Sequence, residues 1–138
     1  MVKVSMSQNL NASADDVWKM IGGFNALPDW HPAVEKSELT EEGQTRTLSL
    51  AGGGTITETL EKMDDGSRTY SYAITDSPLP VANYRSTIKV IGEGDNSTVE
   101  WSSDFDPMGG AEGEAADAVR GIYQAGFDNL QKMFGGGR

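Results

Sequence analysis

The sequence predicts an α+β fold in which one curved antiparallel sheet of seven strands wraps around a long C-terminal helix. A long amphipathic segment ends the chain, shorter segments with strand-like alternation precede it, and clusters of turn residues separate them. Short turns between neighbouring strands require antiparallel pairing. Because the apolar face of the helix is wide, it needs a large partner surface, and a helix laid across a curved sheet tends to enclose a cavity.

The last helix is expected over residues 110–134. Its apolar residues recur every three or four positions and therefore share one side of the helix. That side carries Ala115, Val119, Ile122, Tyr123, Gly126, Phe127, Leu130, Met133 and Phe134. The small residues Ala118, Gly121 and Ala125 lie near its edge, and they are expected to leave room for a ligand.

One strand and two short helices are expected to precede six consecutive strands. The first strand spans residues 2–10, and Ser13 is a candidate N-cap for a helix that ends at Gly22. A second short helix is expected over residues 24–30, interrupted near Pro28. The six strands are expected over residues 34–39, 44–50, 55–62, 68–75, 82–91 and 98–105.

Length and composition bound the domain organisation and the function. The 138 residues are expected to form a single domain, with residues 135–138 as a flexible end. A formal net charge of −10 and a pI of about 4.4 should repel nucleic acid and anionic membranes. The absence of cysteine excludes thiolate chemistry, and a single histidine argues against a metal site.

The chain has no apolar run long enough for a signal peptide or a membrane span. We therefore expect a cytoplasmic protein without membrane insertion. The sequence leaves open whether the protein is a monomer or a homodimer.

Several short motifs occur in the expected order of elements. They are Asp16-Val17-Trp18, Trp30-His31-Pro32, Gly54-Thr55-Ile56-Thr57-Glu58, Asn83-Tyr84 and Asn129-Leu130-Gln131-Lys132. With them, nearly the whole chain resembles the SRPBCC superfamily (START-like, polyketide cyclase/dehydrase type), whose helix-grip fold is that of the birch pollen allergen. Some of the motifs are also similar to the plant abscisic-acid receptors. The resemblance implies the helix-grip fold, but the superfamily includes cyclases, lyases, lipid carriers and hormone receptors, so it does not imply one function.

Strand alternation places one acid on the inner face of the sheet. Glu58 shares a strand face with Ile56 and Leu60, so it points toward the helix if they do. The resemblance to the hormone receptors implies that this glutamate lines the pocket. It could orient a ligand or act as a general base, its pKa raised by apolar surroundings. Alternatively, it pairs with an inward lysine, arginine or tyrosine, or it lies at a wet mouth of the sheet.

The other inward positions are mostly aromatic and aliphatic, which is typical of a small-molecule pocket. The candidate ligand-binding residues are Trp30, His31, Ile56, Tyr70, Ile74, Ser86, Trp101, Phe105, Ala125 and Asn129, and the candidate catalytic residues are Glu58, Tyr72 and Tyr84. The alternative is that these large side chains simply fill a solid core.

Two of these candidates have a plain structural alternative. The resemblance implies that Asn129 reaches a ligand, but its amide could equally bond a neighbouring carbonyl group. His31, the only histidine, could transfer protons near neutral pH, but a histidine beside tryptophan and proline more often braces a turn.

Two loops could gate the pocket. Residues 51–54 and 77–81 match the positions of the gate and latch loops of the hormone receptors. Both loops depart from the receptor motifs, and the chain lacks a lysine that matches the one holding the hormone carboxylate. Binding of abscisic acid is therefore not expected.

The leading hypothesis is a cavity that binds a small hydrophobic or aromatic molecule. If the protein is an enzyme, the simplest chemistry is cofactor-free proton transfer beside a carbonyl group, giving cyclisation, dehydration or isomerisation. Glu58 would be the base, and Tyr72, Tyr84 or Asn129 would hold the oxygen. The alternatives are a non-catalytic carrier or sensor, and an interaction module with a vestigial pocket.

Overall fold

The computed structural model describes residues 2–40, 43–51, 53–77, 81–107 and 112–135. The described residues form, in chain order, β1 (Val2–Leu10), α1 (Ala14–Ile21), α2 (Leu27–Trp30), β2 (Val34–Thr40), β3 (Thr45–Leu50), β4 (Thr55–Asp64), β5 (Thr69–Asp76), β6 (Val81–Glu93), β7 (Asn96–Pro107) and α3 (Glu112–Phe134). The ends of each predicted strand differ from the observed ends by at most two residues. The predicted fold class is confirmed. Of residues 135–138, predicted as a flexible end, Gly135 is described and its carbonyl accepts a hydrogen bond from the Asn11 N–H at 3.0 Å, whereas residues 136–138 lie outside the described residues.

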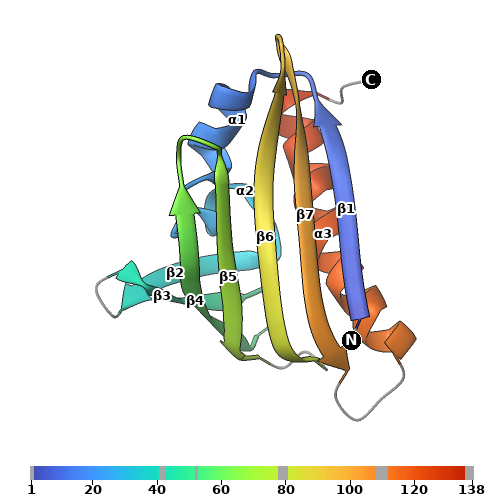
Figure 1. Ribbon diagram of the computed structural model, residues 1–138. Helices are drawn as coiled ribbons and strands as arrows, with labels where there is room; N and C mark the ends of the chain where they lie inside the picture. The colour runs from blue at the N-terminus through green and yellow to red at the C-terminus, as the bar shows by residue number, and fades with distance from the viewer. Residues whose placement is uncertain (1, 41–42, 52, 78–80, 108–111, 136–138) are drawn as a thin grey trace.

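The seven strands form one antiparallel sheet in the order β1-β7-β6-β5-β4-β3-β2. Consecutive strands are neighbours throughout, except that β1 pairs with β7. The two short helices therefore connect one edge strand, β1, to the other, β2 (Figure 1).

Local sequence explains the short helices. The side chain of Ser13 accepts a hydrogen bond from the backbone N–H of Asp16 at 3.2 Å, which caps α1 as predicted. The second helix begins at Leu27, three residues later than predicted. Pro28 lies in its first turn, where a missing N–H costs nothing, so it starts the helix rather than interrupting it.

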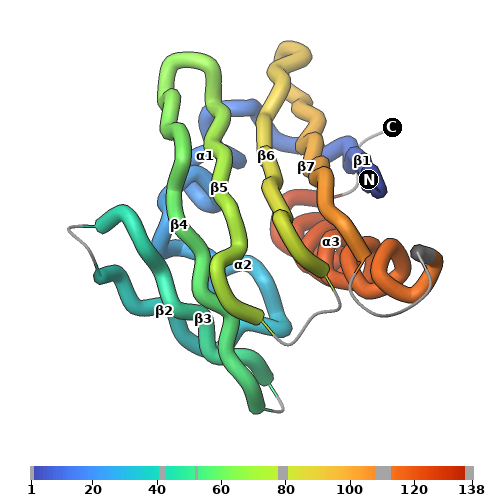
Figure 2. The backbone as a smooth tube through the Cα atoms, turned by 60° about the horizontal axis from the view of Figure 1, so that its bottom comes forward, coloured from blue at the N-terminus to red at the C-terminus, as the bar shows by residue number. Residues whose placement is uncertain are grey.

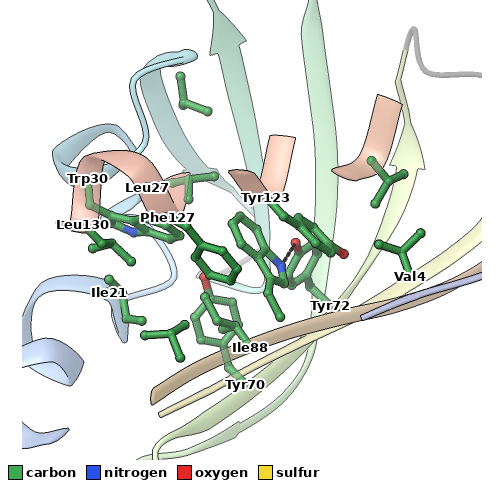
Figure 3. Packing of buried hydrophobic residues seen from close by; sticks show 14 of the residues in the cluster. Val4, Ile21, Leu27, Trp30, Tyr70, Tyr72, Ile88, Tyr123, Phe127 and Leu130 are labelled. Carbon is green, nitrogen blue, oxygen red and sulfur yellow. Dashed lines mark hydrogen bonds between the residues drawn. The ribbon is translucent and has the colours of Figure 1, made fainter. Parts of the chain in front are cut away.

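Helix α3 packs against β1 and β7 and lies away from β2, β3 and β4 (Figure 2). We call β1, β6 and β7 the covered half of the sheet, and β2 to β5 the open half. In the covered half, the Trp101 and Tyr123 rings stack with centroids 4.2 Å apart. The Phe127 ring meets the Trp101 ring edge-on with centroids 6.2 Å apart, and Phe127, Ile88 and Leu130 are almost completely buried in the same apolar cluster (Figure 3).

A β-bulge interrupts β6 near its start. Ala82 pairs with Asp106 and Arg85 pairs with Asp104, so two residues of β6 lie opposite Phe105 alone. Asn83 is the residue turned outward, with φ of 55°, a left-handed conformation that asparagine tolerates well. Because of the bulge, Val81 and Tyr84 both face the interior.

Candidate functional site

A cavity of about 200 Å³ lies between the open half of the sheet, α2 and the middle of α3, and Tyr84 of β6 and Trp101 of β7 line its side toward the covered half. Its wall is mostly aliphatic and aromatic. The lining residues are Leu27, His31, Ala33, Val34, Leu48, Leu50, Ala51, Ile56, Glu58, Tyr72, Ile74, Tyr84, Trp101 and Ile122. Ala51 is exposed while Leu48 and Ile56 are buried, so the cavity opens at the β3–β4 turn and extends inward from there.

One member of a buried ion pair, Glu58, forms part of the cavity wall. Arg46 of β3 lies directly opposite Glu58 of β4, and its Nε and Nη2 atoms approach Glu58 Oε1 at 2.7 and 2.6 Å. Both side chains are almost fully buried. Glu58 lines the cavity and Arg46 does not. Of the two alternatives for Glu58, the structure therefore shows the carboxylate paired with an inward arginine while it also faces the cavity.

Aromatic rings and a carbonyl complete the surroundings of Arg46. Its guanidinium carbon lies 4.2 Å from the ring centroid of Phe24 and 4.9 Å from that of Tyr72, within cation–π range. Nη1 donates to the Phe24 carbonyl at 2.5 Å. The sequence analysis missed Arg46, although it shares a strand face with Leu48 and Leu50, and this alternation was the signal that could have revealed it.

The environment shifts the pKa of the cavity acid. Burial raises the pKa of the Glu58 carboxyl, and the adjacent Arg46 guanidinium partly opposes this rise. Both contacts from Arg46 reach Oε1, and no hydrogen bond or ion pair from the described residues reaches Oε2. The carboxyl group therefore keeps one oxygen able to accept a hydrogen bond.

Tyr72 supplies a polar atom beside Glu58. Its hydroxyl oxygen accepts a hydrogen bond from Trp101 Nε1 at 3.1 Å. Burial, and then the charge of Glu58, raise the pKa of Tyr72 well above its ordinary value, so the hydroxyl stays protonated at neutral pH. None of the described residues takes the hydroxyl hydrogen, which leaves Tyr72 able to donate to a ligand.

His31 braces the fold at the inner end of the cavity. Its Nε2 lies 2.7 Å from the Ile122 carbonyl of α3, and its Nδ1 accepts from the Ala33 N–H at 3.1 Å. Only the neutral ring with hydrogen on Nε2 satisfies both bonds. Burial lowers the pKa of His31, which favours the same neutral form. Both ring nitrogens are thus already used within the protein.

Comparison with known protein families identifies the family of this chain. The family model described as polyketide cyclase / dehydrase and lipid transport matches residues 1–135. The chain belongs to this family. Among curated proteins, none matches the sequence.

Several solved structures are similar to this chain. The protein XoxI from Bacillus cereus is 43% identical to this chain, with a TM-score of 0.95 and coverage of 97% of this chain and 96% of that one. An uncharacterised protein from Bacillus thuringiensis is 44% identical, with a TM-score of 0.94 and coverage of 96% and 98%. The Zhui aromatase/cyclase from a Streptomyces species shares the fold at 18% identity, with a TM-score of 0.77 and coverage of 96% and 92%.

Several residues proposed to bind a ligand in this family member lie outside the cavity lining. They are Trp30, Tyr70, Ser86, Phe105, Ala125 and Asn129. The Asn129 amide donates to the Trp30 carbonyl at 2.8 Å, which is the structural alternative considered for it. Ser86 bonds the hydroxyl of Tyr123 at 2.9 Å. Tyr84 does line the cavity, but its hydroxyl lies 2.6 Å from that of Tyr123.

The small residues of α3 have a different role from the one predicted. Gly121 is exposed, and neither Ala118 nor Ala125 lines the cavity. Gly126 is the small residue that matters for packing. A Cβ atom there would meet Trp30 at 2.9 Å, His31 at 3.0 Å and Trp101 at 3.2 Å. The missing side chain lets the helix approach these rings closely.

The two predicted gating loops are only partly described. Ala51, in the first loop, lines the cavity near its mouth. Gly52 and residues 78–80 lie outside the described residues. Within the described part of the chain, no group of three or more acidic, histidine or cysteine side chains could hold a metal ion. No described helix has the length and apolar character needed to cross a membrane.

Proposed function

We propose that the chain binds a small hydrophobic or aromatic molecule in this cavity. The observation that carries the proposal is an apolar hollow with two polar atoms, Glu58 Oε2 and the Tyr72 hydroxyl, that the described residues leave available. An apolar wall with a few placed polar groups is the usual composition of a small-molecule site.

The volume limits the size of the ligand. An engineered apolar cavity of about 150 Å³ stays dry and binds benzene, whereas drug-sized sites span about 300–1,000 Å³. The volume of about 200 Å³ observed here therefore suits a single substituted ring rather than a polycyclic compound. This protein then acts as a carrier or sensor of a small ring compound.

The test is a titration of isotope-labelled protein with toluene, followed by NMR. Wild-type protein should show saturable shifts confined to cavity residues. Leu48→Phe fills the cavity and should weaken toluene binding at least tenfold. Leu39→Phe makes the same change at an exposed position and should leave binding unchanged. If toluene causes no saturable shift in the wild type, the cavity does not bind small rings and the proposal is wrong.

Proton transfer is a second candidate function, favoured by the free oxygen of a buried carboxylate beside a tyrosine hydroxyl. Glu58 would take a proton from a carbon next to a carbonyl group, and Tyr72 would donate to the developing enolate oxygen. Tyr84 and Asn129 are left out of this step because their polar atoms already bond within the protein.

Deuterium exchange distinguishes catalysis from binding alone. The α-protons of acetophenone, a ketone with a single ring, should exchange faster in heavy water with wild-type protein than with buffer. Tyr72→Phe should remove most of this acceleration. If the protein binds the ketone but the exchange rate equals that in buffer, the catalytic function is contradicted and only the carrier or sensor function is supported.

A further inference from the structure

The cavity is electrically balanced before any ligand enters. Among its lining residues, His31 and Glu58 are the groups that could carry a charge near neutral pH. His31 is held neutral by the hydrogen bonds at both ring nitrogens. Glu58 already has its counter-ion, because Arg46 contacts Oε1 at 2.6 and 2.7 Å.

A charged ligand would find no counter-ion in this site. Arg46 faces the rings of Phe24 and Tyr72 and the Phe24 carbonyl, and it does not line the cavity. An anion entering the cavity would face the Glu58 carboxylate, and a cation would have to compete with Arg46 for it. Transfer of an unpaired ion into an apolar site is very unfavourable. A neutral molecule avoids this cost.

The two available polar atoms differ in what they can do. Glu58 Oε2 accepts hydrogen bonds, whereas Tyr72, whose oxygen already accepts from Trp101, donates its hydroxyl hydrogen. A ligand that satisfies both needs an N–H or O–H group for Glu58 and a carbonyl oxygen for Tyr72. A neutral amide contains this pair of groups within a few atoms.

We propose that the cavity selects a neutral ring compound with an amide-type head group, and that it discriminates against carboxylates and ammonium ions of the same shape. This inference rests on the proposed function and specifies its ligand class. The apolar ring would contact the aliphatic wall formed by Leu48, Ile56 and Ile74, and the head group would face Glu58 and Tyr72.

The test compares four single-ring probes at pH 7, using NMR titration of wild-type protein. Toluene reports on the apolar cavity alone, and benzamide adds the neutral head group. Benzoate and benzylammonium add negative and positive charge at similar size. We expect benzamide to bind at least tenfold more tightly than either ion and no more weakly than toluene.

The outcomes separate the two proposals. If toluene and benzamide both fail to bind, the proposed function itself is wrong. If toluene binds but benzoate or benzylammonium binds as tightly as benzamide, small rings do enter the cavity and the inference about the head group is overturned.

Two substitutions test the role of each polar atom. Tyr72→Phe should weaken benzamide binding at least fivefold and change toluene binding less than twofold. Tyr123→Phe, at a buried tyrosine outside the lining, is the matched control and should leave the ratio of benzamide to toluene affinity unchanged. An equal loss of benzamide binding in both variants would contradict a direct contact with Tyr72.

Glu58→Gln changes the charge balance directly. It leaves Arg46 without its counter-ion, so benzoate should now bind more tightly than benzamide. Glu61→Gln, on the same strand but outside the cavity lining, should keep the wild-type order. An unchanged order in folded Glu58→Gln would contradict the charge argument. If that variant fails to fold, the wild-type probe series and Tyr72→Phe still decide the proposal.

Discussion

The covered and open halves of the sheet have similar inward side chains but different interiors. In the covered half, Trp101 stacks on Tyr123 at 4.2 Å, and the hydroxyls of Tyr84, Tyr123 and Ser86 bond one another. In the open half, Leu48 and Ile56 face a hollow of about 200 Å³. The polar groups also differ, because the covered half uses neutral hydroxyls and the open half contains a buried ion pair.

The difference shows that a side chain on the inner face of the sheet is not necessarily packed in the core. Strand alternation decides which side chains point inward, and it acts in the same way in both halves. The element opposite decides whether those side chains pack or line a cavity. Helix α3 lies against β1 and β7, so the inward residues of β3, β4 and β5 have fewer partners on their far side.

Removing the charge of Glu58 should give the largest loss of stability, because among the described residues only Glu58 forms an ion pair with the buried Arg46. Glu58→Gln leaves the buried guanidinium of Arg46 unpaired, and breaking a buried pair costs about 3–5 kcal/mol. Urea denaturation measures the loss. Glu61→Gln should change the free energy of unfolding by less than about 0.5 kcal/mol. A loss below about 1 kcal/mol for Glu58→Gln would mean that the pair is not buried in solution.

Equal truncations in the two halves test whether packing really differs. Leu130→Ala removes a side chain enclosed by the covered core and should cost about 3–5 kcal/mol. Leu48→Ala should cost nearer about 2 kcal/mol, because one side of Leu48 already faces the cavity. Both values come from denaturant unfolding. Equal losses would mean that the open half is packed as densely as the covered half.

A methyl group added to α3 should sharpen the comparison where the two halves meet. Gly126→Ala places a Cβ 2.9 Å from Trp30 and 3.0 Å from His31, and such overpacking costs about 1–3 kcal/mol. The higher helix propensity of alanine offsets up to about 1 kcal/mol. Gly121→Ala meets nothing within 4 Å and should stabilise the helix. Equal melting temperatures for the two variants would contradict the close contact of α3 with Trp30 and His31 at Gly126.

The smallest expected effect is a pH dependence due to His31. Burial lowers its pKa in the folded state, so the unfolded state binds more protons once the pH falls below about 6.5. The free energy of unfolding should therefore decrease below that pH, by at most about 1.4 kcal/mol per pH unit.

Glu58 acts in the opposite direction, because its raised pKa favours the folded state as the pH falls toward the ordinary value of 4.5. The difference in unfolding free energy between wild type and His31→Asn, measured from pH 8 to pH 5, isolates the histidine. A difference that does not change with pH would contradict a buried neutral ring.

Most of the fold could be predicted from the sequence. Period-two alternation, turn residues and the apolar stripe of the last helix are local signals, and local geometry converts them directly into elements. The error at Pro28 has a local cause as well. Proline can begin a helix or interrupt one, and the sequence around residues 24–30 is compatible with either position.

The candidate site could be predicted only in part. The inward direction of Glu58, Tyr72 and Trp101 follows from alternation, but their partners do not. The pair with Arg46 depends on the register of β3 against β4, which places those two residues opposite each other. The alternation of Arg46 with Leu48 predicts its inward direction, but charged side chains are usually assigned to the surface.

The bulge at Asn83 has a consequence for the length of the chain. Three positions separate Val81 from Tyr84, so a regular strand with the same residues would place them on opposite faces of the sheet. The extra residue turns Val81 back to the interior. Deletion of Asn83 would leave a regular strand in which Val81 and Tyr84 still share the inner face, whereas an insertion at this point would turn Val81 outward.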